Sequence, residues 1–304
     1  MKLVVRILVV GMLASALVTV ASAASTTPNA AGMTLGAADV PGAKVVSQGS
    51  LAKGTYLAAY QRTLRLGVPY GRSLIVYVRS QGMLAQSPDQ VQSDFAQVQT
   101  LFKLKAARKS FAAAIASGAH VNVSAVSLGA IRHPGVGDAS LEQPVSVLIK
   151  GTRVYESVLF MRFDRTLLEL EVGGARPVAL ADSAGLARIM QAHATQQLTP
   201  VNLAAPVVAG TPDVGQTLTV TPGTWTNTDV ARGYQWERCD ATAANCVAIP
   251  GATSSTYVVT PEDANSTLEV VETATDRFAA PTATSAATAA VPVPAAPPAA
   301  APAP

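Results

Sequence analysis

The sequence predicts an α+β domain, an antiparallel sheet with two main helices, followed by a second domain that is an all-β sandwich. Residues 33–198 show strand-like alternation of apolar and polar residues, interrupted by two segments with helical periodicity. Residues 205–288 carry short, regularly spaced strand segments separated by turn residues, which is typical of a sandwich. The length of 304 residues also favours two domains over one.

The N-terminus has the pattern of a secretory signal peptide. Lys2 and Arg6 precede a mostly apolar run over residues 7–20, and residues 21–23 (ASA) supply the small side chains of a cleavage site. The alternative is a membrane anchor, but the run is short for a span of about 20 residues. We therefore expect residues 1–23 to be removed and the mature chain to be secreted or associated with the cell envelope, without spanning the membrane.

Three further segments are expected to have no fold of their own. They are a flexible leader at residues 24–32, a linker at residues 199–204, and a disordered tail of proline, alanine and valine at residues 289–304. Charge is unequal along the chain, with 17 basic and 10 acidic residues at 24–203 (+7) but 3 basic and 9 acidic residues at 204–304 (−6). This asymmetry fits an anionic ligand on the first domain, attraction between the domains, or two solvated surfaces.

The helices of the first domain are predicted by their start signals and their periodicity. A strand is expected at residues 72–80, and a helix begins after Ser87, which is its N-cap, with Pro88 at the first helical position. Apolar residues then recur with helical spacing and continue this helix to about residue 117. A final helix is expected over residues 177–197.

Three strands joined by tight turns lie between these helices. The segments are residues 144–150, 155–163 and 166–172, and together they predict an antiparallel meander. In the last strand Glu169 and Glu171 alternate with apolar residues. We expect both carboxylates to face water.

The second domain shows alternation in "QTLTVTPGTW", "YQWERC", "TYVVT" and "STLEVVETAT". In the last of these, Leu268, Val270 and Glu272 would share one face of a regular strand. A glutamate on an apolar face is unfavourable, so a bulge or a sheet edge is expected near Glu272.

The chain has two cysteines, Cys239 and Cys246. In an exported protein such a pair is expected to form a disulfide. The alternative is a metal pair, but zinc needs four ligands and no second cysteine pair or histidine pair lies nearby. A disulfide closing so short a loop stabilises a fold by roughly 2–3 kcal/mol.

The segments "VGQTLTVTPGTW", "YQWERC", "CVAIPGATSSTYVVTPED" and "NSTLEV" resemble a bacterial immunoglobulin-like repeat of secreted and surface proteins. The resemblance implies a core that includes Trp236 and Tyr257, Trp225 closing one end, and Asp263 capping the turn before a core strand. Antibody-type domains join two sheets by their disulfide. Here the cysteines are too close in sequence, so they should clip the hairpin around "DATAAN". Such repeats act as spacers or adhesive modules.

The first domain resembles the PsbP-like and mycobacterial LpqN-like secreted domains in "ADVPGAKVVSQG", "VLFMRFDRTLLELEVGG" and "ALADSAGLARIM". That group is mostly non-enzymatic, so the resemblance implies a binding or accessory role. It transfers no functional residue to this chain.

One motif offers an enzymatic alternative. Ser50 and Lys53 spell the S-x-x-K nucleophile motif of penicillin-recognising enzymes, which requires the serine at the start of a buried helix with the lysine one turn later. The surrounding "SQGSLAKGTYL" instead predicts a hairpin. No catalytic group, metal site or cofactor is therefore expected, and a secreted serine hydrolase remains the alternative function.

Four basic residues crowd two helical turns, namely Lys103, Lys105, Arg108 and Lys109. They are candidates for binding an anionic envelope polymer or another envelope protein, and the alternative is a solvated helix face. Few aromatic residues accompany them, so nucleic-acid binding is not expected. The predicted function is a secreted, non-enzymatic binding or structural protein of the cell envelope.

Overall fold

The computed structural model describes residues 28–52, 54–226 and 230–293. The predicted signal peptide lies outside the described residues. The chain is mostly β-strand with few helices, arranged in several antiparallel sheets. It divides into two compact units, Asn29–Gln197 and the chain from Leu198 onward. No helix in the described ranges is long and apolar enough to cross a membrane.

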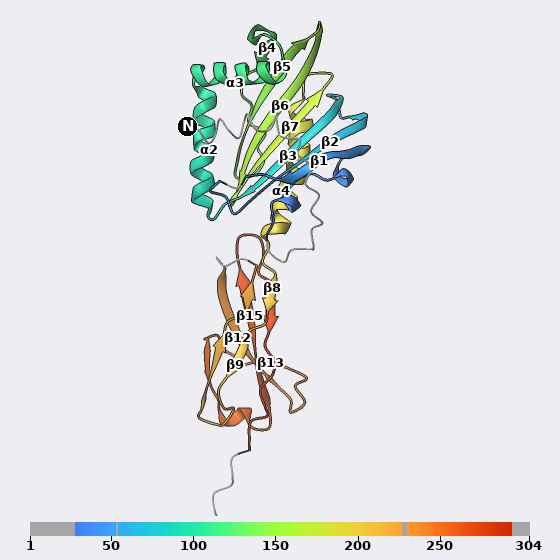
Figure 1. Ribbon diagram of the computed structural model, residues 1–304. Helices are drawn as coiled ribbons and strands as arrows, with labels where there is room; N and C mark the ends of the chain where they lie inside the picture. Colours follow the sequence, from blue (N-terminus) through green and yellow to red (C-terminus); the bar gives the residue numbers. More distant parts are fainter. Residues whose placement is uncertain (1–27, 53, 227–229, 294–304) are drawn as a thin grey trace, which may run out of the picture. The chain divides into compact units, whose positions relative to one another are not determined.

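The first unit contains a seven-stranded antiparallel sheet with strand order β1-β2-β3-β7-β6-β5-β4 (Figure 1). The strands are β1 Ala43–Ser50, β2 Ala58–Tyr70, β3 Ile75–Leu84, β4 Val126–Leu128, β5 Ala139–Ile149, β6 Thr152–Phe163 and β7 Thr166–Gly174. The predicted meander is β5-β6-β7, and β5 begins earlier than expected. The hairpin expected around "SQGSLAKGTYL" is formed by β1 and β2, whose full extents were not predicted. Their register shifts between Val45 and Ser47.

Among the described residues, this unit has three α-helices: α2 Pro88–Lys103, α3 Lys105–Gly118 and α4 Leu180–Leu198. The Ser87 hydroxyl accepts the backbone N–H of Gln90 and caps α2 as predicted. The expected single helix to residue 117 is wrong, because Leu104 is extended (ψ 123°) and separates α2 from α3. The bend keeps apolar side chains on the sheet, since Phe102 of α2 meets Phe111 of α3 edge-to-face at 5.3 Å.

Short 3-10 turns complete the first unit: η1 Ala31–Met33, η2 Ala37–Asp39 and η3 Val123–Ala125. The predicted leader is corrected where it is described. The side-chain amide of Asn29 donates to Gln197 Oε1 at 3.0 Å, and Ala30 is buried. Residues 29–32 are therefore part of the folded first unit.

The sheet of the first unit is covered differently on its two faces. Helix α2 packs on the face that carries Met83, Phe160 and Leu167. On the opposite face, a Cβ at Gly82 would come within 2.8 Å of the Ala30 carbonyl, so the N-terminal segment crosses the sheet there. Helix α4 packs with that segment, since His193 Nδ1 lies 3.3 Å from the Thr34 carbonyl oxygen.

The second unit contains a four-stranded sheet (β13-β12-β15-β16), a three-stranded sheet (β14-β10-β9) and a two-stranded sheet (β11-β8). The strands are β8 Asn202–Ala204, β9 Val207–Ala209, β10 Thr217–Thr221, β11 Thr224–Trp225, β12 Ala231–Cys239, β13 Val247–Ala248, β14 Thr256–Val258, β15 Thr267–Thr275 and β16 Thr282–Thr284, and η4 spans Pro261–Asp263. Its core cluster comprises Leu218, Val220, Trp236, Val259, Leu268, Val270 and Val291.

Three expectations about this unit are corrected. Residues 202–204 of the predicted linker form β8 and pair with β11. Val291 of the predicted tail is 2% exposed and bonds through its backbone to Asn265 and Ser266, so the described start of the tail is ordered. Glu272 causes no bulge: it pairs in regular register with Tyr234 and is fully buried.

Candidate functional site

A pocket of about 250 Å³ lies in the first unit beside strands β4, β5 and β6. Its lining includes Leu128, Arg132, Pro144, Ser146, Tyr155, Glu156 and Val178. The walls are therefore mostly apolar, and Arg132 supplies a guanidinium group. A small number of polar groups in an apolar pocket is the usual arrangement of a small-molecule site.

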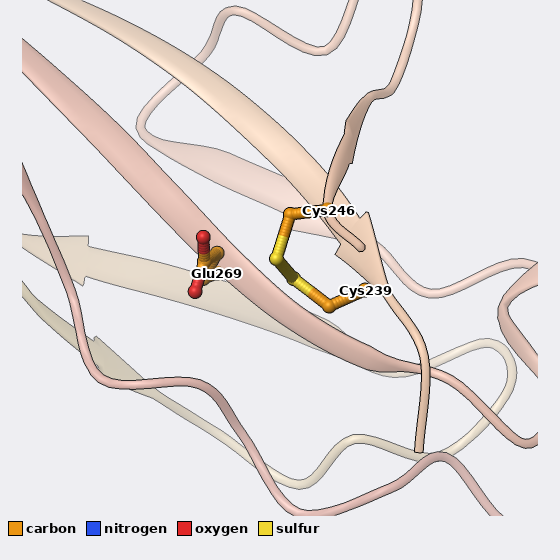
Figure 2. A group of neighbouring side chains, drawn as sticks. All are labelled: Cys239, Cys246 and Glu269. Atoms are coloured by element: carbon orange, nitrogen blue, oxygen red, sulfur yellow. A yellow bond between two sulfur atoms is a disulfide. The ribbon is translucent and has the colours of Figure 1, made fainter. Parts of the chain in front are cut away.

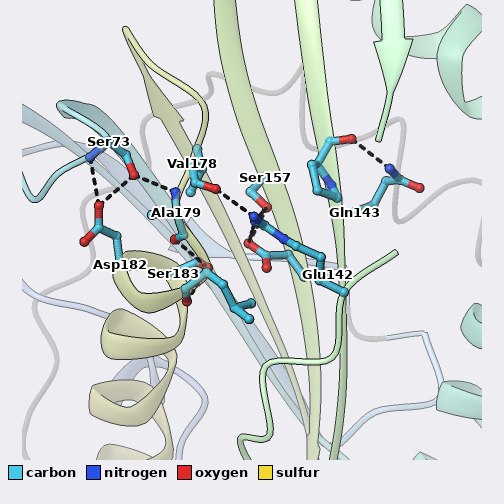
Figure 3. A network of polar contacts seen from close by, with 11 residues as sticks. Ser73, Glu142, Gln143, Ser157, Val178, Ala179, Asp182 and Ser183 are labelled. Atoms are coloured by element: carbon cyan, nitrogen blue, oxygen red, sulfur yellow. Dashed lines mark hydrogen bonds and ion pairs between the residues drawn. The ribbon is translucent and has the colours of Figure 1, made fainter. Parts of the chain in front are cut away.

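The guanidinium of Arg132 is held by Glu142, Ser157 and Val178, which are labelled in Figure 3. Nη2 lies 2.8 Å from Glu142 Oε1 and 3.4 Å from the Ser157 hydroxyl, while Nη1 donates to the Val178 carbonyl at 2.9 Å. The Ser157 hydroxyl also donates to Glu142 Oε1. Backbone bonds between Arg132 and Glu142 bring the two residues together. Glu142 is fully buried, so its charge is compensated by Arg132 rather than by water.

The same network anchors the start of α4 (Figure 3). The Ser73 hydroxyl donates to Asp182 Oδ2 at 2.6 Å and accepts the N–H of Ala179 at 2.7 Å. The neighbouring Gly71 has a positive φ of 68°, and a Cβ there would approach Asp182 to 2.7 Å. The carbonyl of Val178 is thereby fixed where it meets Arg132, and the pocket wall is rigidly placed.

A second polar cluster lies on the α2 face of the central strands. Arg79 of β3 stands opposite Glu171 of β7 and forms an ion pair with it. Strand alternation places Glu169 on the same face, next along β7. The expectation that both glutamates face water is wrong, because Glu169 is 3% exposed and Glu171 is 7% exposed.

Glu156 of β6 and Tyr77 of β3 complete this cluster, which we call the Arg79 cluster. Both are half-buried and flank Gly173 of β7. Burial raises the pKa of Glu169 to about 7, and Arg79 opposes the shift. Burial also raises the pKa of Glu156, again opposed by Arg79. Oε2 of Glu169 is buried and has no hydrogen-bond partner within the described structure.

The predicted anion-binding residues surround the bend between α2 and α3. Lys103, Lys105 and Lys109 are exposed. Arg108 differs from the lysines, because it is half-buried and its guanidinium donates to Gln143 Oε1 at 2.8 Å and to the Gly129 carbonyl at 3.0 Å. Three lysines, rather than four basic residues, therefore face solvent.

The S-x-x-K alternative lacks the helix that its chemistry requires. Ser50 is the exposed last residue of β1 and pairs with Tyr60 of β2, so no helix begins at this serine. Lys53 lies outside the described residues. The segment has the hairpin geometry that its glycines predict.

In the second unit, Cys239 and Cys246 form a disulfide (Figure 2). Cys239 ends β12 and Cys246 precedes β13, so the bond clips the β12-β13 hairpin. The two sulfurs and a Glu269 carboxylate oxygen form the one group of three metal-type ligand atoms within 4.8 Å of each other in the described ranges. Because both sulfurs are bonded to each other, neither is a thiolate ligand.

The aromatic and acidic residues of the predicted immunoglobulin-like core lie in the second unit. Trp236 is fully buried, stacks on the half-buried Tyr257 at 5.4 Å, and donates from Nε1 to the Ser254 carbonyl. Asp263 is fully buried in η4 and accepts the Tyr257 hydroxyl at 2.8 Å. Trp225 is 5% exposed, and its Nε1 donates to Glu272.

Sequence reasoning missed three central residues of these sites. Arg132 and Glu142 were not predicted, and Glu169 was predicted to face water. Their sequence signal is weak, since each glutamate sits in an otherwise alternating strand where polar residues normally face water. Only the pairing of distant strands shows that these side chains are enclosed.

No protein-family model and no curated protein matches the chain. Among solved structures, the extracellular domain of PknH from Mycobacterium tuberculosis is similar to it over 55% of this chain and 100% of that domain, with 7% sequence identity and a TM-score of 0.34. A likeness of this degree carries no argument about fold, function or location.

Proposed function

We propose that the chain is an exported, non-enzymatic binding protein whose first unit holds a small carboxylate in the pocket beside Arg132. In this proposal the first unit is the α+β domain and the second is an immunoglobulin-like sandwich that serves as a spacer. The observation that carries the proposal is a guanidinium fixed by buried partners in a mostly apolar pocket.

The hydrogen-bond capacity of Arg132 supports an oxygen-bearing ligand. A guanidinium has five N–H donors. Those of Arg132 make contacts to Val178, Ser157 and Glu142, and Nε is buried without a partner. The side chain is 27% exposed, and Arg132 is among the residues that line the pocket. A ligand carboxylate would accept there in a charge-assisted hydrogen bond.

The size of the pocket limits the ligand. A volume of about 250 Å³ lies at or below the lower end of drug-sized sites, which begin near 300 Å³. The fitting ligand is therefore a short aliphatic or aromatic carboxylic acid, or the end group of a longer envelope component. The walls formed by Leu128, Pro144 and Val178 suit an apolar body.

The spacer role of the second unit is supported by its buried polar groups, which form hydrogen bonds within the unit. Asp263 binds Tyr257, Arg238 and the backbone of Thr260 within the unit. A disulfide further constrains the β12-β13 hairpin. The clip is consistent with an oxidising, extracytoplasmic compartment.

The test uses benzoate as the probe and neutral benzamide as its control, with the full chain and isothermal calorimetry. We expect millimolar binding of benzoate and at least about tenfold weaker binding of benzamide. Ser146→Phe should fill the pocket and abolish binding without altering the Arg132 network. The matched control is Ser110→Phe on the exposed face of α3, which should bind benzoate as the wild type does. Equal affinity for both probes, or full affinity in Ser146→Phe, would contradict the proposal.

The exposed lysines of the α2-α3 bend support a wider contact with an anionic envelope polymer. Lys103, Lys105 and Lys109 are the residues concerned. The purified chain should pellet with envelope material from the source cell at low salt and be released at high salt, because surface charges are screened. The triple change of these lysines to glutamine should abolish pelleting, and pelleting that persists in this variant would exclude the surface.

A further inference from the structure

We propose that the Arg79 cluster is a second binding site of the first unit, for a small organic cation that carries an ammonium group. The cluster lies on the α2 face of the sheet, and Glu156 is its one member that also lines the Arg132 pocket. The inference does not depend on the proposed carboxylate function.

The first argument is the balance of charge within the cluster. Three carboxyl groups, those of Glu156, Glu169 and Glu171, lie on the same sheet face as one guanidinium, that of Arg79. Arg79 pairs directly with Glu171. Arg79 is also the one cation that acts on Glu156 or on Glu169 among the described groups. Buried charges are stable only when they are paired or neutralised, so the cluster has room for further positive charge.

The second argument is the unused acceptor of Glu169. This side chain is almost fully enclosed, at 3% exposure, and its Oε2 has no donor within the described structure. Buried carboxylate oxygens normally accept hydrogen bonds. Strand alternation directs this group to the same side as Arg79 and Glu171. An N–H from a bound ligand would supply the donor that the chain does not.

The third argument is a glycine on the same sheet face as the carboxylates. Gly173 follows Glu171 on the same face of β7, between Tyr77 and Glu156. A Cβ at Gly173 would lie 3.5 Å from Tyr77 Cδ1 and 3.9 Å from Glu156 Cγ, which are ordinary contacts. Packing therefore does not require glycine here. Glycine in a strand interior weakens the strand and often marks a place where a ligand approaches.

The geometry favours an ammonium group over a metal ion. The carboxylates of the cluster do not bring three ligand atoms within 4.8 Å, a condition that the described chain meets at Cys239, Cys246 and Glu269. An alkylammonium group has three N–H donors and can bridge acceptors that are further apart. Its apolar stem would lie beside the ring of Tyr77, which also attracts a cation.

The test is a titration of the full, isotope-labelled chain with butylamine at about pH 8, with butanol as the neutral control of the same length. We expect a saturable shift of the Gly173 amide resonance with butylamine and none with butanol. Glu169→Gln and Gly173→Ala should each weaken binding by at least about tenfold. Gly173→Ala retains the fold because its new methyl makes ordinary contacts. Glu262→Gln, at an exposed acid of the second unit, is the matched control and should bind normally.

The pH dependence gives an independent readout. Arg79, Glu171, Glu156 and Tyr77 face Glu169, and protonation of Glu169 removes one acceptor charge. Below about pH 7 the affinity for butylamine should fall by up to tenfold per pH unit, and this slope should disappear in Glu169→Gln. Equal shifts with butanol, no shift at all, or undiminished binding in Gly173→Ala would each overturn the proposal.

Discussion

Both units bury a glutamate on a strand that is paired on both sides, but they treat it in opposite ways. In the second unit, Glu272 Oε2 accepts the Gly223 N–H at 2.6 Å, and Oε1 meets both Trp225 Nε1 and the Arg232 guanidinium. In the first unit, Glu169 retains an oxygen with no partner within the described structure. One carboxylate is fully used by its own chain, and the other has an acceptor to spare.

A glycine in each region also differs in the room that it leaves for a side chain: Gly223 lies against Glu272, and Gly173 lies on the same strand as Glu169, four residues further on. A Cβ at Gly223 would come within 2.6 Å of the Ala204 carbonyl and 3.0 Å of Glu272 Oε2, so this position requires glycine. A Cβ at Gly173 would meet only ordinary contacts. The comparison teaches that a buried charge is not by itself a sign of function. A buried carboxylate oxygen without a partner marks a candidate binding group, whereas a carboxylate with both oxygens paired is explained by its structural role.

The largest expected effect comes from Glu272→Gln. The change removes one charge of a buried ion pair and replaces a carboxylate oxygen, which accepts hydrogen bonds, by an NH2 group that would face other donors. We therefore expect the second unit to lose about 4 kcal/mol of unfolding free energy. Urea denaturation followed by tryptophan fluorescence measures this unit selectively, because Trp225 and Trp236 are the two tryptophans of the chain. The control Glu262→Gln should change stability by less than about 0.5 kcal/mol. A loss below about 1 kcal/mol in Glu272→Gln would contradict the claim that the pairing of Glu272 stabilises the second unit.

The corresponding substitution, Glu169→Gln, should have the opposite effect on the unfolding free energy. Burial raises the pKa of Glu169 from 4.5 to about 7. Between these pH values the unfolded chain ionises first, so this group's contribution to stability falls as pH rises and is fully lost above about pH 7. At about pH 8, Glu169→Gln should therefore stabilise the first unit by roughly 3 kcal/mol, and near pH 4 it should be close to neutral.

Urea denaturation followed by the circular dichroism of α2 and α3 reports this unit. Because of Glu169, the urea midpoint of the wild type should be higher at low pH than at high pH. The variant should lack this pH dependence. Destabilisation of the variant at pH 8 would show that Glu169 is as fully satisfied as Glu272.

A smaller loss of unfolding free energy is expected when the disulfide of the second unit is removed. Replacing both Cys239 and Cys246 by alanine should lower the unfolding free energy of this unit by roughly 2–3 kcal/mol, because the open loop has more unfolded conformations. Tryptophan fluorescence is again the readout, and the first unit should be unaffected. An unchanged midpoint would mean that the hairpin is held by its other contacts alone.

The smallest expected change in stability comes from replacing each of the two glycines by alanine. Gly173→Ala should raise the stability of the first unit by about 0.5–1 kcal/mol, because it reduces the freedom of the unfolded chain without strain. Gly223→Ala should instead destabilise the second unit, since its methyl would meet backbone. Thermal denaturation of the two variants provides the test, and a loss of stability in Gly173→Ala would show that the space beside Tyr77 is already filled.

Local signals predicted much of the framework. Ser87 caps α2 where the sequence places the helix start, and strands β6 and β7 follow the alternation of their residues. The break at Leu104 was not predictable, because helical periodicity continues through it and only packing of Phe111 on Phe102 decides the bend.

The candidate sites were harder to predict than the framework. Glu169 and Glu171 occupy positions that alternation assigns to solvent, and their burial depends on Arg79, which is 92 residues from Glu171. Arg132 and Ser157 meet Glu142 across two strands of the sheet. Such contacts follow from strand order, which no local pattern encodes. Polar residues in a regular strand are therefore informative only once their cross-strand neighbours are known.

The most direct test of the central claim is a backbone-amide resonance titration of the full chain with benzoate. If the first unit is the binding unit and the second a spacer, shifts should cluster at Arg132, Ser146 and Val178, and the resonances of residues 198–293 should stay in place. Shifts in the second unit, or none anywhere at saturating benzoate, would contradict this division of roles.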